Sequence, residues 1–124
     1  MYLALKTDSE ISEYYLVDSS GSIADKLIWE SGRNLADGIL KKLAELINKS
    51  DTSWDSIRGV VVFKGPGSFT GLRIGITVAN SIAYGKKISI VGEVGDDWLK
   101  DGVARLNQGT TDKQVIPEYG SEPN

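Results

Sequence analysis

Two residue types are missing from this chain of 124 residues, which contains no cysteine and no histidine. Without cysteine the chain has neither a disulfide framework nor a thiolate nucleophile. Without histidine it lacks the commonest metal ligand and the commonest general base of proteins. Much familiar enzyme chemistry is therefore excluded from the outset.

Long apolar runs and a strong net charge are missing as well. No run of apolar residues is long enough to cross a bilayer, and the N-terminus lacks the basic start and apolar stretch of a signal peptide. We therefore expect a cytoplasmic protein without membrane contact. The formal net charge of −3 gives no general electrostatic case for nucleic-acid binding. The length suits one small domain with a single core.

The spacing of apolar residues predicts seven successive elements. Strands are expected at residues 2–5, 13–17, 26–29, 60–63 and 86–92. Helices are expected at residues 35–48 and from residue 68 or 70 to 84, with Ser68 or Thr70 as the cap and Gly85 as the stop. The order β-β-β-α-β-α-β predicts an α/β fold, a single ribonuclease-H-like lobe with a mixed sheet and helices packed on it.

The pattern weakens beyond Gly92. We expect residues 1–92 to form the lobe and residues 93–124 to form a short helix and an extended acidic tail. The short helix is indicated by Trp98 and the apolar residues that follow it at helical spacing. Within the tail, Val115 and Ile116 are the expected anchor.

A glycine-rich stretch, "FKGPGSFTGLRIG" at residues 63–75, separates the fourth strand from the second helix. It fails the phosphate-loop pattern because no lysine follows Gly71, and its glycine spacing is one residue too long for a dinucleotide fingerprint. An anion contact through the helix N-terminus is still an alternative, with the candidate residues Gly65, Gly67, Ser68 and Thr70. We favour the other alternative, a tight turn in which glycine is needed for the backbone shape.

Small residues recur at every fourth position along the second helix, at Gly71, Gly75, Ala79 and Ala83. Each glycine inside a helix costs about 1 kcal/mol relative to alanine, so a compensating close approach of another backbone is expected. The approaching element is either the first helix or the sheet of the same domain, or a helix of another subunit. The pattern leaves both alternatives open.

The stretch "GPGSFTGLRIGITVANSIAYG" resembles the signature of the TsaB (YeaZ) family, bacterial proteins needed for the threonylcarbamoyl modification of adenosine beside the tRNA anticodon. The flanking "SWDSIRGVVVFK" and "ISIVG" are similar to that family too, and "IPEYGSEPN" resembles its C-terminal segment. The resemblance covers residues 1–92 well. It implies an actin-like, ribonuclease-H-related fold that normally has two lobes, so this chain is expected to be a member shortened to the first lobe and a tail.

The resemblance also implies a function. Family members act as non-catalytic scaffolds that bind and activate TsaD, the catalytic subunit, and a TsaE-type ATPase joins the complex. We therefore expect no catalytic residue, a homodimer in isolation, contact with tRNA only through the complex, and no cofactor on the chain alone. A nucleotide at the interface with TsaD is a further expectation. The partner-binding residues implied on the two helices are Leu35, Ile39, Leu43, Gly71, Arg73, Gly75, Ala79 and Ala83.

Two departures from the family affect this interpretation, and one is that "SGRNLADG", before the first helix, lacks the family's usual histidine. The first strand of the family ends in an Asp-Thr pair that helps related ATPases hold metal and phosphate, whereas this chain has Lys6 and Thr7. An amine cannot ligate magnesium, and Asp8, one place later, is expected to point to the other face. TsaD-like metal binding through paired histidines is impossible. The alternative function is a degenerate actin-like nucleotide-binding protein or ATPase that uses the Gly65–Gly71 loop.

Overall fold

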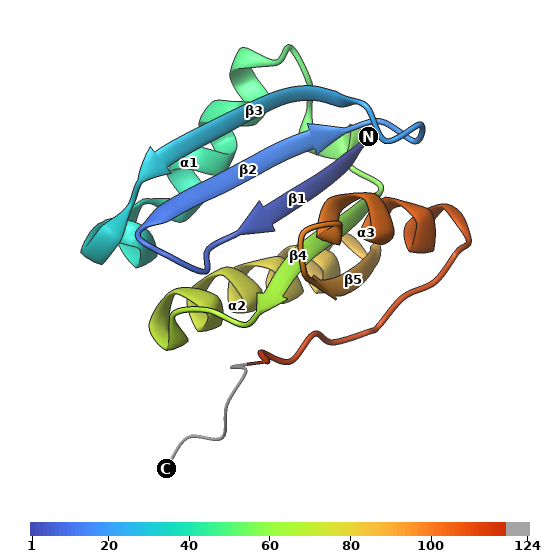
Figure 1. Ribbon diagram of the computed structural model, residues 1–124. Coiled ribbons are helices and arrows are strands. Elements are labelled where there is room, and N and C mark those ends of the chain that lie inside the picture. Colours follow the sequence, from blue (N-terminus) through green and yellow to red (C-terminus); the bar gives the residue numbers. More distant parts are fainter. Residues whose placement is uncertain (119–124) are drawn as a thin grey trace.

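The computed structural model describes residues 1–118, which form one five-stranded mixed sheet with helices on both faces (Figure 1). The order of the strands across the sheet is β3-β2-β1-β4-β5. Strand β1 pairs in parallel with β4, which pairs in parallel with β5, while β2 runs antiparallel to both β1 and β3. The strands are β1 (Tyr2–Lys6), β2 (Ile11–Val17), β3 (Ile23–Glu30), β4 (Gly59–Gly65) and β5 (Ser89–Val94).

Two long helices cover one face of the sheet and a shorter helix covers part of the other (Figure 1). Helices α1 (Leu35–Lys49) and α2 (Phe69–Lys86) lie on the first face, and α3 (Trp98–Asn107) lies over β4 and β5 on the second. Short 3-10 turns at Gly32–Asn34 and Trp54–Ser56 complete the elements. The element order confirms the predicted α/β lobe.

The central strands are buried on both sides because helices cover both faces there. Strand β4 is a nearly continuous apolar run whose residues Val60 to Val62 have no exposed surface. On the α3 side, the Phe63 ring meets Trp98 edge to face. Edge strand β3 instead alternates between exposed and half-buried residues, and α1 packs against it.

The predicted end of α2 was wrong. The helix continues through Gly85 to Lys86, and Lys87 takes the left-handed conformation with φ +57°. The backbone N–H of Lys87 bonds the Tyr84 carbonyl, so a lysine closes the helix where glycine was expected. Ser68 precedes the first turn as predicted, but its side chain makes no capping hydrogen bond.

After α3 the chain turns back along the outer edge of β5 and passes beside α2 (Figure 1). We call residues 110–118 the strap. Val115 is buried in it, whereas Ile116 is 72% exposed, so only the first of the two predicted anchors holds the strap. Strand β5 runs past Gly92 to Val94, and the division of the chain at residue 92 stays a prediction. None of the helices within residues 1–118 has the length and apolar character needed to cross a bilayer.

Candidate functional site

Gly71 and Gly75 of α2 lie against Thr7, the residue that directly follows β1. A Cβ atom placed on Gly75 would lie 2.1 Å from Thr7 Oγ1, and one on Gly71 would lie 2.5 Å from the Thr7 carbonyl oxygen. Thr7 is 1% exposed and donates a 2.8 Å hydrogen bond to the Gly71 carbonyl. The predicted close approach is confirmed, and the approaching element is the sheet of the same domain.

This packing buries most of the predicted partner-binding residues, whose contact with a partner stays a prediction. Six of them are buried, at no more than 4% exposure or packed against Thr7, and only Ile39 of these six also lines the groove described next: Leu35, Ile39, Leu43, Gly75, Ala79 and Ala83. The physical reason is that the apolar and small faces of α1 and α2 are the faces that cover the sheet. Of the predicted set, Arg73 is exposed and Gly71 is half-buried.

An apolar groove of about 370 Å³ lies beside these buried residues, between α1 and α2. The residues that line it are Ala36, Ile39, Leu40, Thr70, Arg73, Ile74, Thr77 and Val78. Leu40 is 60% exposed and adds apolar surface to this groove. The sequence predicted a partner contact on these two helices and included Ile39 and Arg73, but it did not single out Leu40, Ile74 or Val78.

One end of the groove carries a cation and an aromatic ring. The Arg73 guanidinium lies 5.6 Å from the centre of the Phe69 ring, and Phe69 is 48% exposed. Arg73 and Thr70 both line the groove. The groove therefore combines an apolar floor with a positive charge at one end, an arrangement that suits an apolar helix carrying an acidic residue.

The glycine loop packs on the turn that follows β1. A Cβ atom on Gly67 would lie 2.6 Å from the Cβ of Asp8, and the Ser68 N–H donates a 2.7 Å hydrogen bond to the Asp8 carbonyl. Gly65 has φ +124°, a conformation that L side chains rarely adopt. These contacts favour the tight turn over an anion cradle, because the loop is closed by its own domain.

A hollow of about 350 Å³ lies where an actin-like protein would hold metal and phosphate, at the carboxyl ends of β1 and β4. Lys6 and Asp8 both line it, and Lys6 Nζ lies 2.9 Å from Asp8 Oδ1 and 3.8 Å from Glu13 Oε2. Asp8 therefore lies beside Lys6, and its predicted place on the other face was wrong because β1 ends at Lys6 and the chain turns. Asp96 lines the same hollow.

Tyr15 completes the polar cluster next to Lys6. Its hydroxyl donates a 2.5 Å hydrogen bond to Glu13 Oε1. Burial raises the pKa of Tyr15 above its usual value, and the hydrogen bond to the Glu13 carboxylate together with the repulsion between the two charges raises it further. Tyr15 is therefore a neutral donor at physiological pH, and Glu13 already has two partners.

These residues do not fit a nucleotide with its magnesium ion. The position of the metal-holding carboxylate is taken by Lys6, whose charge is matched by Asp8 and Glu13, and Asp96 adds a further negative charge. Within residues 1–118, no three acidic side chains are grouped so that they could hold a metal ion. An anionic phosphate would meet more negative than positive charge in this hollow.

The isolated chain should therefore show no saturable ATP binding. Isothermal titration of the chain with ATP and Mg²⁺ is expected to give only the heat of dilution, because phosphate is repelled and the metal has no ligand. A titration at low ionic strength is the stricter test, since weak attraction is least screened there. An isotherm that saturates at one ATP per chain would contradict this prediction.

Comparison with known proteins agrees with the α/β fold described above. The family model described as TsaD, tRNA N6-adenosine threonylcarbamoyltransferase, matches residues 30–93. A tRNA threonylcarbamoyladenosine biosynthesis protein TsaB of Escherichia coli (strain K12) is 27% identical over 106 residues, which cover 73% of this chain and 46% of the relative. The TsaB protein of Bacillus subtilis (strain 168) is 44% identical over 45 residues, 36% of this chain and 20% of the relative.

A solved structure agrees with the topology. YeaZ from Pseudomonas aeruginosa superposes with a TM-score of 0.70 at 24% identity, over 88% of this chain and 51% of that chain. The chain spans about half or less of the length of the proteins it matches. The likeness thus extends over the sheet and its helices, and over the glycine loop that lies within residues 30–93.

Proposed function

Because this chain belongs to the TsaB (YeaZ) family, within the domains described by the TsaD tRNA N6-adenosine threonylcarbamoyltransferase model, we propose that it is an accessory subunit of tRNA threonylcarbamoyladenosine synthesis. It binds a TsaD-type catalytic subunit and performs no chemistry itself. The observation that carries this proposal is the exposed apolar groove between α1 and α2. Exposed apolar surface that adjoins a charged residue supports a role in protein contact.

Two features of the residues support a non-catalytic role. The chain has no histidine or cysteine, so an imidazole base or metal ligand and a thiolate nucleophile are missing. At the corner where a nucleotide would be bound, Lys6 stands in place of a carboxylate and is paired with Asp8. The transferase activity in the name of the matching family model is therefore assigned to the partner.

The groove suits one helix of the partner. Helix-in-groove recognition uses apolar anchors at helical spacing, and the floor formed by Ile39, Ile74 and Val78 offers an apolar strip for them. Arg73 at the rim pairs with a carboxylate of the partner, which fixes the direction of the bound helix. The same face would serve a homodimer when the partner is absent, and the two states would then compete.

The remaining members of the complex follow from the family. A TsaE-type ATPase joins the heterodimer, tRNA is reached only through the complex, and a nucleotide at the interface with TsaD would be held mainly by the partner. The complex works in the cytoplasm. Each of these stays a prediction.

Mixing the chain with the TsaD of the same organism tests the proposal. Multi-angle light scattering should give the mass of a heterodimer for the wild-type chain. Leu40→Asp should weaken the complex about 30-fold or more, which corresponds to about 2 kcal/mol, because a charge would be buried in an apolar contact. Leu40 is exposed in the free chain, so the variant is expected to fold normally.

Asn48→Asp is the matched control, because it places the same new charge at an exposed position of α1 outside the groove. It should bind TsaD as the wild type does. Absence of any wild-type complex would overturn the proposed function. A complex that Leu40→Asp leaves intact would move the contact away from the groove.

A further inference from the structure

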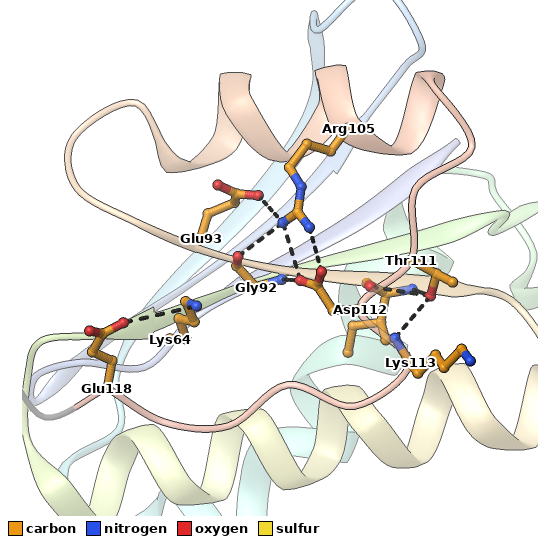
Figure 2. Close-up of polar contacts among 9 residues, drawn as sticks. Lys64, Gly92, Glu93, Arg105, Thr111, Asp112, Lys113 and Glu118 are labelled. Carbon is orange, nitrogen blue, oxygen red and sulfur yellow. Dashed lines mark hydrogen bonds and ion pairs between the residues drawn. The ribbon is translucent and has the colours of Figure 1, made fainter.

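The outer edge of β5 is bound by the strap (Figure 2). An edge strand presents unpaired N–H and C=O groups that another chain could bind. Here the Ile90 N–H donates to Thr111 Oγ1 at 3.2 Å, and the Gly92 N–H donates to Asp112 Oδ2 at 2.8 Å. The Asp112 N–H in turn donates to the Ile90 carbonyl at 2.7 Å. Thr111 and Asp112 of the strap thus supply hydrogen-bond partners to the backbone of β5, largely through their side chains.

Arg105 of α3 binds this part of the strap and the neighbouring end of β5. Figure 2 shows its guanidinium between Glu93 and Asp112. It donates to Glu93 Oε2 at 2.6 Å, to Asp112 Oδ2 at 3.1 Å and to the Gly92 carbonyl at 3.3 Å. Burial of Asp112 acts against its charge, but the bonds from Arg105 and the Gly92 N–H hold the pKa of Asp112 below its usual value. The strap therefore offers β5 a carboxylate rather than a carboxylic acid at neutral pH.

Val115 fills a space that β5 and α2 leave open. Gly92 has no side chain, and a Cβ atom there would lie 2.5 Å from Val115 Cγ1. Asn80 of α2 holds the backbone of Val115 at both ends, accepting from its N–H at 2.9 Å and donating to its carbonyl at 3.0 Å. Val115 is 4% exposed, so the space fits one small branched side chain.

At its far end, the strap is held by a main-chain hydrogen bond and by a long ion pair. The Glu118 N–H donates to the Lys64 carbonyl at 2.7 Å, and Lys64 Nζ lies 3.9 Å from Glu118 Oε2 (Figure 2). A Cβ atom on Gly65 would lie 1.8 Å from the Glu118 carbonyl oxygen. The whole receptor surface, from Ile90 through Gly92 to Lys64, is therefore shaped to receive an extended chain.

We propose that the β5 edge, together with Asn80 and Arg105, is an acceptor site for an extended peptide with an acidic residue followed three positions later by valine. This chain fills the site with its own strap, through Asp112 and Val115. The strap is exchangeable, so a separate peptide of the same pattern binds when the strap is weakened. Recognition follows the usual logic of strand addition, in which backbone bonds give affinity and side-chain pockets give specificity.

The test compares two neighbouring residues of the strap in the full chain. Val115→Ser removes the buried side chain, whereas Ile116→Ser changes the exposed residue beside it and is the control. Residue-resolved amide exchange by NMR should show the Ile90 and Gly92 amides exchanging about tenfold faster or more in Val115→Ser, since the strap leaves the edge more often. Ile116→Ser should match the wild type.

A synthetic peptide with the sequence of residues 110–118 should then restore protection of Ile90 and Gly92 in Val115→Ser. A peptide with serine in place of valine should not, and wild-type exchange should not change because its own strap occupies the site. Unchanged exchange in Val115→Ser, or failure of the peptide to restore it, would overturn the proposal. An equal rise at Ala4 in β1 would do so too, because it would indicate general loosening of the fold.

Discussion

Replacing Gly75 by alanine should destabilise the domain by about 2–4 kcal/mol, a large part of the stability of a domain of this size. The new Cβ atom would lie 2.1 Å from Thr7 Oγ1 and 3.0 Å from Thr7 Cγ2. Thr7 is held in place, because it is buried and its hydroxyl donates to the Gly71 carbonyl. Either α2 lifts off the sheet, or Thr7 changes rotamer and its buried hydroxyl loses that hydrogen bond. Urea unfolding followed by tryptophan fluorescence measures the loss.

Gly85→Ala is the matched control in the same helix. A Cβ atom at Gly85 meets no other atom within 4 Å, so alanine should raise the free energy of unfolding by up to about 1 kcal/mol through helix propensity alone. One substitution type is therefore expected to act with opposite signs at two positions of α2. Equal stability of Gly75→Ala and the wild type would show that α2 does not approach β1 as closely as described.

The sequence could predict this close approach but not the element that makes it. The four-residue spacing of small residues requires a backbone nearby, whatever the source of that backbone. Helix α2 also carries apolar residues on a second face, where Ile74 and Val78 line the groove. Periodicity shows that a helix has two apolar faces, yet it does not say which of them covers the sheet. The burial of Thr7 against Gly75 decides this, and it depends on contacts between residues far apart in the chain.

The order of elements was predictable, because alternation and helical spacing are local properties of the sequence. The strap shows neither of these local patterns. Its bonds to β5 come from the side chains of Thr111 and Asp112, and its valine is held by Asn80 of a distant helix. The sequence predicted Val115 as an anchor of the tail, but not the space beside Gly92 that receives it, since a single glycine in a strand has several explanations.

The hollow at the carboxyl ends of β1 and β4 was also predictable only in part. The resemblance at residues 65–75 predicted where the glycine loop lies, and the exchange of a carboxylate for Lys6 was visible in the sequence. The pairing of Lys6 with Asp8 was missed because it depends on how the chain turns after β1. Strand geometry alone places neighbouring residues on opposite faces, and that rule ends where the strand ends.

Two leucines of α1 should separate stability from partner binding. Leu43 has no exposed surface, so Leu43→Ala should cost about 2–5 kcal/mol of unfolding free energy through lost burial and the cavity left behind. Leu40, one turn earlier, is 60% exposed and lines the groove, so Leu40→Ala should change stability by no more than about 0.5 kcal/mol. Urea unfolding of the two variants under identical conditions measures both values.

The order of the two variants should reverse when binding of TsaD is measured. Leu40→Ala removes a side chain from the proposed contact and should weaken the complex about tenfold, which corresponds to about 1.4 kcal/mol. Leu43→Ala, studied at a temperature where it is still folded, should bind nearly as the wild type does, because its side chain faces the core. Calorimetric titration with TsaD distinguishes the cases. Loss of binding in Leu43→Ala with full binding in Leu40→Ala would favour the buried face of α1, and the domain would then have to open before the partner could reach it.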